Sequence, residues 1–174
     1  MPFILRFMIF KLPSHPINFT HKIAIFPLLL CFCFSLNAGD VREVKPLNFG
    51  VIALKDNNAS YSMRITFAGQ IQTDPAIVVI EPGHPAQYEL TGFTANTPLN
   101  ITVIVPSAQT QLAGASDPST SQFTITDHHT FSPIISTDNL GNAIVNVGAT
   151  LTTSGSGFYK DATYFSHMTI MVNY

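Results

Sequence analysis

Apolar and polar residues alternate along most of the chain after residue 46, a period of two that is typical of β-strands with one buried face. In residues 61–67, tyrosine, methionine, isoleucine and phenylalanine share one face, and serine, arginine and threonine share the other. Residues 77–80 are a continuous β-branched run, which predicts a strand buried on both faces. No stretch after residue 38 shows a helical stripe of three turns. We expect strands over residues 47–54, 61–67, 77–80, 86–90, 99–105, 123–126, 134–135, 143–153 and 163–174.

Turn-forming residues separate these segments. Asp56-Asn57-Asn58, Glu81-Pro82-Gly83 and Asn139-Leu140-Gly141-Asn142 carry the short polar, proline and glycine residues that favour turns. Gly148 interrupts the longest predicted strand and indicates a bulge there, and residues 109–120 are expected to form an exposed loop. The pattern predicts an all-β fold, an immunoglobulin-like antiparallel β-sandwich of about 8–9 strands.

The first 38 residues have a different character. Residues 23–36 are uncharged and almost wholly apolar, and Arg6, Lys11 and Lys22 precede them. This run is shorter than the roughly 20 apolar residues that span a bilayer, and it fits the core of a secretion signal. We therefore expect a cleavable signal peptide over residues 1–38 and a single β-sandwich domain over residues 39–174. An uncleaved membrane anchor is the alternative.

Removal of this leader changes the charge and the cysteine content. All ten acidic residues but only five of the eight basic residues lie in residues 39–174, so the net charge there is about −5. Such a domain lacks the basic footprint of a nucleic-acid-binding protein or of a protein held on anionic lipid. Both cysteines, Cys31 and Cys33, lie in the leader. The domain is therefore expected to fold in the periplasm, at the cell surface or outside the cell without disulfides, and without membrane attachment.

Candidate chemistry is sparse. His128 and His129 follow Asp127, but neighbouring side chains on a strand point to opposite faces, which disfavours one shared metal ion. Glu81 and Glu89 flank a predicted turn and could meet across a hairpin, as a glycosidase requires, although a solvated turn is the simpler interpretation. The segment Asp56-Asn57-Asn58 offers oxygen ligands for calcium but lacks the residue spacing of a calcium-binding loop. We therefore predict no enzyme activity, no catalytic residue, no cofactor and no metal site.

Four landmarks together carry a resemblance. They are Leu47-Asn48-Phe49-Gly50, the run from Ala86 to Gly92 (AQYELTG), Val147-Gly148-Ala149-Thr150-Leu151, and Gly157-Phe158-Tyr159 before the closing Val172-Asn173-Tyr174. In order and spacing they resemble domain-of-unknown-function family 4402, exported proteins of Gram-negative bacteria. The resemblance spans nearly all of residues 39–174 and implies no activity for any residue. The family is similar in outline to spore-coat-U-like proteins and pilin subunits, which are exported β-sandwiches.

The last predicted strand suggests a function. It alternates and ends at Tyr174, and such an edge strand can pair with another protein by β-augmentation. We predict a structural or surface-associated protein, a fimbrial or pilin-like subunit whose partners are a periplasmic chaperone or like subunits. Lys45-Pro46 interrupts the segment before Phe49, so a donor strand there is poorly made or absent. A monomeric carbohydrate- or ligand-binding module is the alternative, and a hydrolase is a third. The residues expected at the assembly edge are Tyr164, Met168, Ile170, Val172 and Tyr174.

Overall fold

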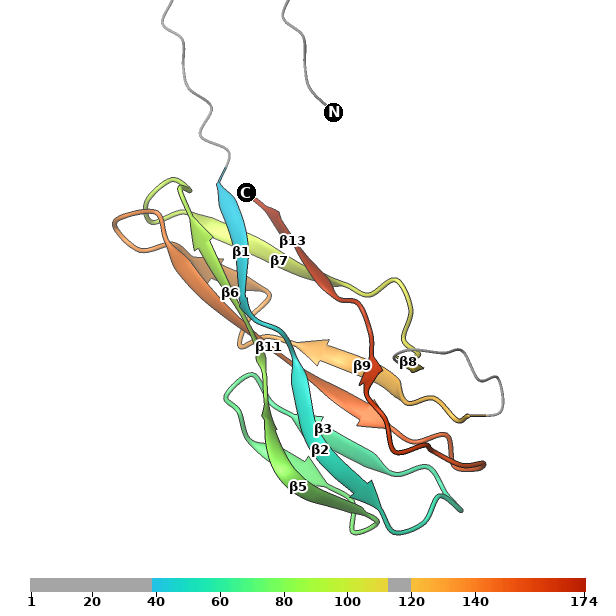
Figure 1. The fold of residues 1–174 in the computed structure, drawn as a ribbon. Helices are drawn as coiled ribbons and strands as arrows, with labels where there is room; N and C mark the ends of the chain where they lie inside the picture. The colour runs from blue at the N-terminus through green and yellow to red at the C-terminus, as the bar shows by residue number, and fades with distance from the viewer. Residues whose placement is uncertain (1–38, 113–119) are drawn as a thin grey trace, which may run out of the picture. The chain divides into compact units, whose positions relative to one another are not determined.

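The computed structural model describes residues 39–112 and 120–174, and in these residues the chain forms β-strands and no helix. Most strands are short, and in two places only one or two residues separate consecutive strands (Figure 1). They are β1 (Asp40–Lys45), β2 (Asn48–Leu54), β3 (Ser62–Ile65), β4 (Ile71–Thr73), β5 (Ile77–His84), β6 (Ala86–Thr91), β7 (Pro98–Ile104), β8 (Gln111–Leu112), β9 (Thr124–His129), β10 (Ile134–Ser136), β11 (Ala143–Thr152), β12 (Tyr164–Phe165) and β13 (Thr169–Asn173).

The strands pair antiparallel in four sheets. The largest has the order β1-β6-β11-β3-β4, and β9 pairs with β11 beside this path. The second has the order β10-β7-β13, and two ribbons are formed by β12 with β8 and by β2 with β5. The ten-residue strand β11 joins the parts of the largest sheet, because it pairs with β6 near its start and with both β3 and β9 near its end.

Two long segments of chain change sheets at the same level. β1 and β2 are separated by Pro46-Leu47, and β5 and β6 by Pro85. β1 pairs with β6 while β2 pairs with β5, so the two segments stay neighbours and leave the large sheet together. A side chain on Gly83 would collide with the backbone carbonyl of Asn48, which explains the need for glycine at this crossing.

The interior consists of two apolar clusters. The larger cluster lies between the β6–β11 part of the large sheet and strand β7; its buried members are Ala86, Tyr88, Leu90, Phe93, Leu99, Ile101, Val145 and Val147. The smaller cluster contains Met63, Ile65 and Ile77, with Phe49, Ile52 and Leu54 of β2 packed against it. The β2–β5 ribbon therefore covers strand β3 in the same way that the second sheet covers β6 and β11. The predicted all-β antiparallel sandwich is confirmed.

Some details of the sequence prediction are wrong. The structure has more strands than expected because the predicted strand over 163–174 is divided into β12 and β13, and because β1, β4 and β8 form where no strand was predicted. Residues 77–80 are not buried on both faces, since Val78 and Ile80 are 40% and 62% exposed. Gly148 does mark an irregularity, a register shift between Gly148 and Thr150 in the pairing of β11 with β9.

The predicted signal peptide, residues 1–38, lies outside the described residues, as does the greater part of the predicted loop at 109–120. The described residues belong to one compact unit. None of them lies in a helix of a length and apolarity that would cross a membrane.

Candidate functional site

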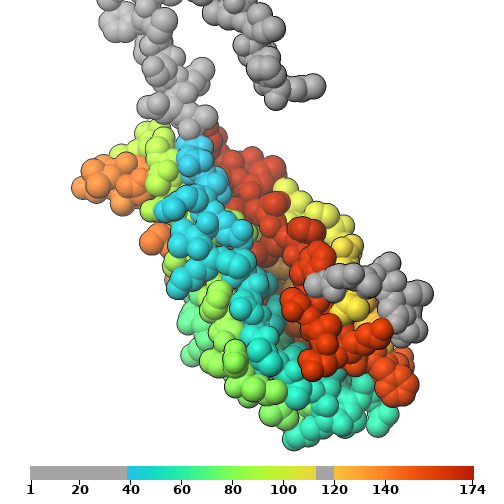
Figure 2. Space-filling model, viewed as in Figure 1, coloured from blue at the N-terminus to red at the C-terminus, as the bar shows by residue number. Residues whose placement is uncertain are grey.

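A groove of about 870 Å³ lies between β2 and the segment 159–168, which contains β12. Residues 46–54 form one wall, and residues 159–168 form the other. In Figure 2 the two walls, cyan and red, run side by side on one face of the molecule. The groove is thus bounded by chain segments from opposite ends of the domain sequence.

Each wall has an unused strand edge. Among the described residues, β5 is the strand that pairs with β2, and β2 has no second strand partner there. On the other wall β12 pairs with β8 and the following strand β13 pairs with β7, and neither has a second strand partner within 39–112 and 120–174. A strand can pair along both edges, so β2 and β12 each keep one edge without a strand partner among the described residues.

The floor of the groove is apolar and well packed. Phe123, Ile125 and Leu151 lie on or beside β9 and β11, line the groove and are 5–8% exposed. The Phe123 ring stacks on Tyr159 at 4.2 Å between ring centroids and meets Tyr164 edge-on at 5.0 Å. These contacts hold the 159–168 wall against the floor, because aromatic pairs of this geometry stabilise beyond the area they bury.

The two walls run in opposite directions. β2 continues the direction of β1, and successive antiparallel pairings lead from β1 through β6, β11 and β9. The bridge from Thr124 to Gln109 and the pairing of β8 with β12 complete this path and leave β12 antiparallel to β2. A strand placed in the groove is therefore antiparallel to one wall and parallel to the other.

The five residues predicted at the assembly edge fall into three environments. Tyr164 and Met168 line the groove. Ile170 and Val172 are half-buried and pack against the larger core cluster. Tyr174 is 73% exposed and meets the ring of Phe93 edge-on at 5.4 Å. The predicted alternation over 164–172 is present, but only its first part lies in the groove.

Sequence reasoning missed the opposite wall and the floor. The segment 47–54 was recognised as a strand, and Phe123 and Ile125 were recognised as part of one. Nothing in their local pattern shows that they border the same space, because the pairings that bring them together join residues far apart in the chain.

Groove residues also include His128, whose pKa is lowered mainly by burial, while Asp127 opposes this effect and His129 adds to it.

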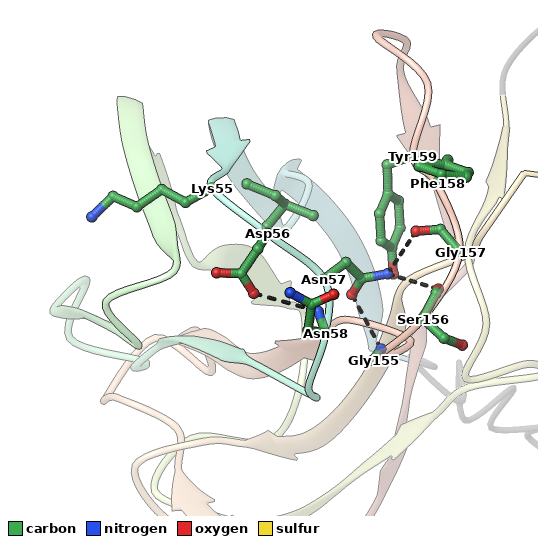
Figure 3. Close-up of a pocket in the computed structure, with 10 residues that line it drawn as sticks. Lys55, Asp56, Asn57, Asn58, Gly155, Ser156, Gly157, Phe158 and Tyr159 are labelled. Carbon is green, nitrogen blue, oxygen red and sulfur yellow. Dashed lines mark hydrogen bonds between the residues drawn. The ribbon is translucent and has the colours of Figure 1, made fainter.

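A second hollow, of about 620 Å³, lies between residues 54–58 and 155–159 (Figure 3). The side-chain amide of Asn57 is fully hydrogen-bonded there. Its nitrogen donates to the carbonyls of Ser156 at 2.7 Å and Gly157 at 3.2 Å, and its oxygen accepts from the Gly155 N–H at 3.1 Å. Asn57 therefore ties two loops together and is not left open to a ligand.

The residues that the sequence suggested as metal ligands or catalytic acids have structural roles. Asp56 accepts the Tyr61 hydroxyl at 2.6 Å, which supports the turn interpretation of this segment. Glu81 and Glu89 are not joined by a hairpin, since β5 and β6 run on in the same direction, and Glu89 pairs with Arg42 of β1. Among the described residues, no group of three or more histidine, cysteine or acidic side chains is placed to hold a metal ion.

Comparison with known proteins gives one finding. The family model described as "Domain of unknown function (DUF4402)" matches residues 40–174, which include every described strand. No curated protein and no solved structure matches the chain significantly.

Proposed function

The chain belongs to the DUF4402 family, and we propose that it is an exported structural protein that assembles by accepting an extended segment of a partner protein in the groove. The observation that carries this proposal is that β2 and β12 each have one edge without a strand partner among the described residues, and that their segments border the groove over an apolar floor. The signal peptide predicted from the sequence of residues 1–38 supports export.

The groove favours an extended segment over a compact ligand. A strand can form backbone hydrogen bonds to both walls and, in every second position, place a side chain over Phe123, Ile125 and Leu151. Each fully buried aliphatic side chain stabilises the complex by about 1.5–3 kcal/mol, whereas ordering the backbone costs about 1–2 kcal/mol per residue. Apolar burial alone thus roughly offsets ordering, and net affinity depends on the hydrogen bonds along the two edges.

Two exposed valines of the β2–β5 ribbon provide a matched test. Val51 is 46% exposed and lines the groove, while Val78 is 40% exposed and is not among the residues that line it. Val51→Asp places a charge where the partner segment would be buried, so we expect at least a tenfold loss of complexes recovered from the exported fraction. Unheated denaturing gels measure these complexes as heat-labile bands.

Val78→Asp introduces the same charge on the same ribbon and is expected to leave the bands unchanged. Thermal melting of both variants checks that the fold is intact, as expected for exposed positions. A wild-type protein that is exported and shows no heat-labile complex, or an equal loss in both variants, would contradict the proposal.

A further inference from the structure

A second surface lies on the side of the sheet opposite the groove floor. Strands β4, β3, β11 and β9 are neighbours, and their inward residues, such as Met63 and Leu151, are buried. Side chains alternate between the faces of a strand, so the residues between them point outward. The strand registers place these outward residues side by side in two rows, here called the polar ladder: Gln72–Arg64–Thr150–Thr126 and Ser62–Thr152–Thr124.

Most of the ladder's hydrogen-bonding capacity is unused within the protein. The side chains of Gln72, Thr124, Thr126 and Thr152 make no hydrogen bond to any described residue. Buried Thr137 differs: its hydroxyl donates to the Thr94 carbonyl at 2.7 Å and accepts from the Thr97 N–H at 2.9 Å. The ladder therefore presents a row of donors and acceptors to an external molecule.

Aromatic rings border one end of the ladder. At Gly148 the rows stop, because the backbone of residues 65–67 lies against this glycine. Gly148 pairs with His129, whose ring meets Phe67 edge-on at 6.2 Å, and Phe67 in turn meets Phe131 at 5.6 Å. Phe131 is 82% exposed, so an apolar ring stands in solvent beside the hydroxyl rows.

The charges near the ladder are one cation and two carboxylates, a small net charge of about −1. Arg64 pairs with Asp127 at 3.5 Å, and Asp74 accepts the backbone N–H of Ser62 at 2.7 Å and its hydroxyl at 3.1 Å. A face with one cation and two occupied carboxylates does not attract a polyanion or a polycation. The ligand that matches it is neutral, flat and rich in hydroxyls.

We propose that the polar ladder binds a neutral oligosaccharide or polysaccharide chain. Sugar hydroxyls can both donate to and accept from the threonine hydroxyls and the Gln72 amide, and the C–H face of a sugar ring can pack on Phe131. This site is independent of the groove, since it uses the opposite face of the same strands. The protein would then carry a glycan contact on one face and a partner strand on the other.

The test is a titration of isotope-labelled exported protein with neutral gluco- and manno-oligosaccharides, followed by the amide resonances. We expect concentration-dependent shifts at Thr124, Thr126, Thr150 and Thr152 and none along β2. The double variant Thr126→Val/Thr152→Val keeps side-chain shape and strand preference but removes two hydroxyls, and should weaken binding at least tenfold. Thr102→Val, an exposed threonine of β7, is the matched control and should bind as the wild type does.

Three results would overturn the proposal. In the first, none of these sugars shifts the ladder resonances. In the second, the shifts fall in the groove or around Asn57 instead. In the third, the double variant binds as tightly as Thr102→Val. Dextran sulfate serves as a polyanionic comparison, and preferential, salt-sensitive binding of that polymer would equally overturn a neutral-glycan site. Loss of strand binding at the groove would leave these results unaffected, so the two proposals fail separately.

Discussion

At the scale of single residues, the fold depends on places where two backbones meet with no room for a side chain. Gly141 has φ +81° and ends the turn that follows β10, and a β-carbon there would collide with the carbonyl of Phe93. The Phe93 N–H in turn donates to the Gly141 carbonyl at 3.1 Å. Phe93 belongs to the larger core cluster, so this glycine fixes the turn directly against the interior.

Gly141→Ala should therefore destabilise the protein by about 3 kcal/mol or more, since left-handed strain and a backbone collision add together. Gly69→Ala is the matched control, because Gly69 has φ +80° but has only the Pro85 ring near it, at 3.8 Å. Its cost should be limited to about 1–2 kcal/mol of conformational strain. Urea denaturation of both variants measures the difference, and equal costs would show that the collision at Phe93 is relieved without strain.

Turn residues of this kind could be recognised from the sequence, but their partners could not. Asn139-Leu140-Gly141-Asn142 and Asp56-Asn57-Asn58 were both predicted as turns, because glycine, asparagine and aspartate have local preferences. That Gly141 meets Phe93 and that Asn57 binds the loop at 154–157 depends on how distant strands pair. The groove could not be predicted for the same reason. Each wall has a local sequence pattern, but the placement of the two walls opposite each other depends on the pairing of distant strands.

At the scale of elements, the two terminal strands differ in how well the sequence revealed them. β13 alternates cleanly and was predicted. β1, with the sequence DVREVK, does not alternate, and all six of its residues are exposed. It pairs with β6 along one edge, with a register shift between Glu43 and Lys45. Charged residues on an edge strand are a common protection against unwanted pairing. Because β1 is rich in such residues, its composition alone does not predict a strand.

One edge of β13 has no strand partner in the described part of the chain, and this leads to an element-scale prediction. A strand appended after Tyr174 through an Asn-Gly turn would run back along β13 into the groove. With apolar residues at the positions that face Phe123 and Ile125, it should raise the melting temperature by about 5 °C or more, because it buries the floor within one chain. Differential scanning calorimetry measures this shift.

The control is the same appended sequence shifted by one residue. A one-residue shift turns every apolar side chain to the opposite face of the strand, so composition and length stay constant while complementarity is lost. We expect this version to melt no higher than the unmodified protein. Equal stabilisation by both versions would mean that the appended chain acts nonspecifically and that the groove does not select a strand.

At the scale of the whole molecule, we expect His128 to lower the free energy of unfolding when the pH becomes mildly acidic. Burial lowers the pKa of this histidine below its ordinary value of 6.5, so the folded protein favours the neutral ring. The unfolded chain binds more protons as the pH falls through 6.5, and the free energy of unfolding therefore decreases below that pH. Stability contributed by the neutral ring is fully present above pH 6.5 and is lost on acidification.

Urea denaturation of the wild type and of His128→Gln at pH 7.5 and pH 5.5 tests this expectation. The wild type should lose more stability between the two pH values than the variant does, because glutamine does not titrate. Carboxylates common to both proteins contribute equally and cancel in the comparison. An equal loss in both would show that His128 does not govern the acid response in this range.

The fold class at this scale was predictable, and the connections were not. Period-two alternation, the absence of a helical stripe and frequent turns predicted an antiparallel sandwich, and this is confirmed. Alternation does not say which sheet a strand joins, and the paired sheet changes at Pro46-Leu47 and Pro85 leave only a proline as a local sign. The division of one interior into two clusters follows from those changes and was not foreseen.

The division of the interior into two clusters has a consequence for how a partner segment would enter the groove. The smaller cluster rests on three fully or nearly fully buried side chains, whereas the larger one rests on eight. Regions with fewer buried apolar contacts open at lower free energy than the whole domain unfolds. The β2–β5 ribbon, which provides one wall of the groove, covers the smaller cluster. Transient separation of this ribbon would widen the entrance while the remainder of the molecule stays folded, so an incoming chain would not have to wait for global unfolding.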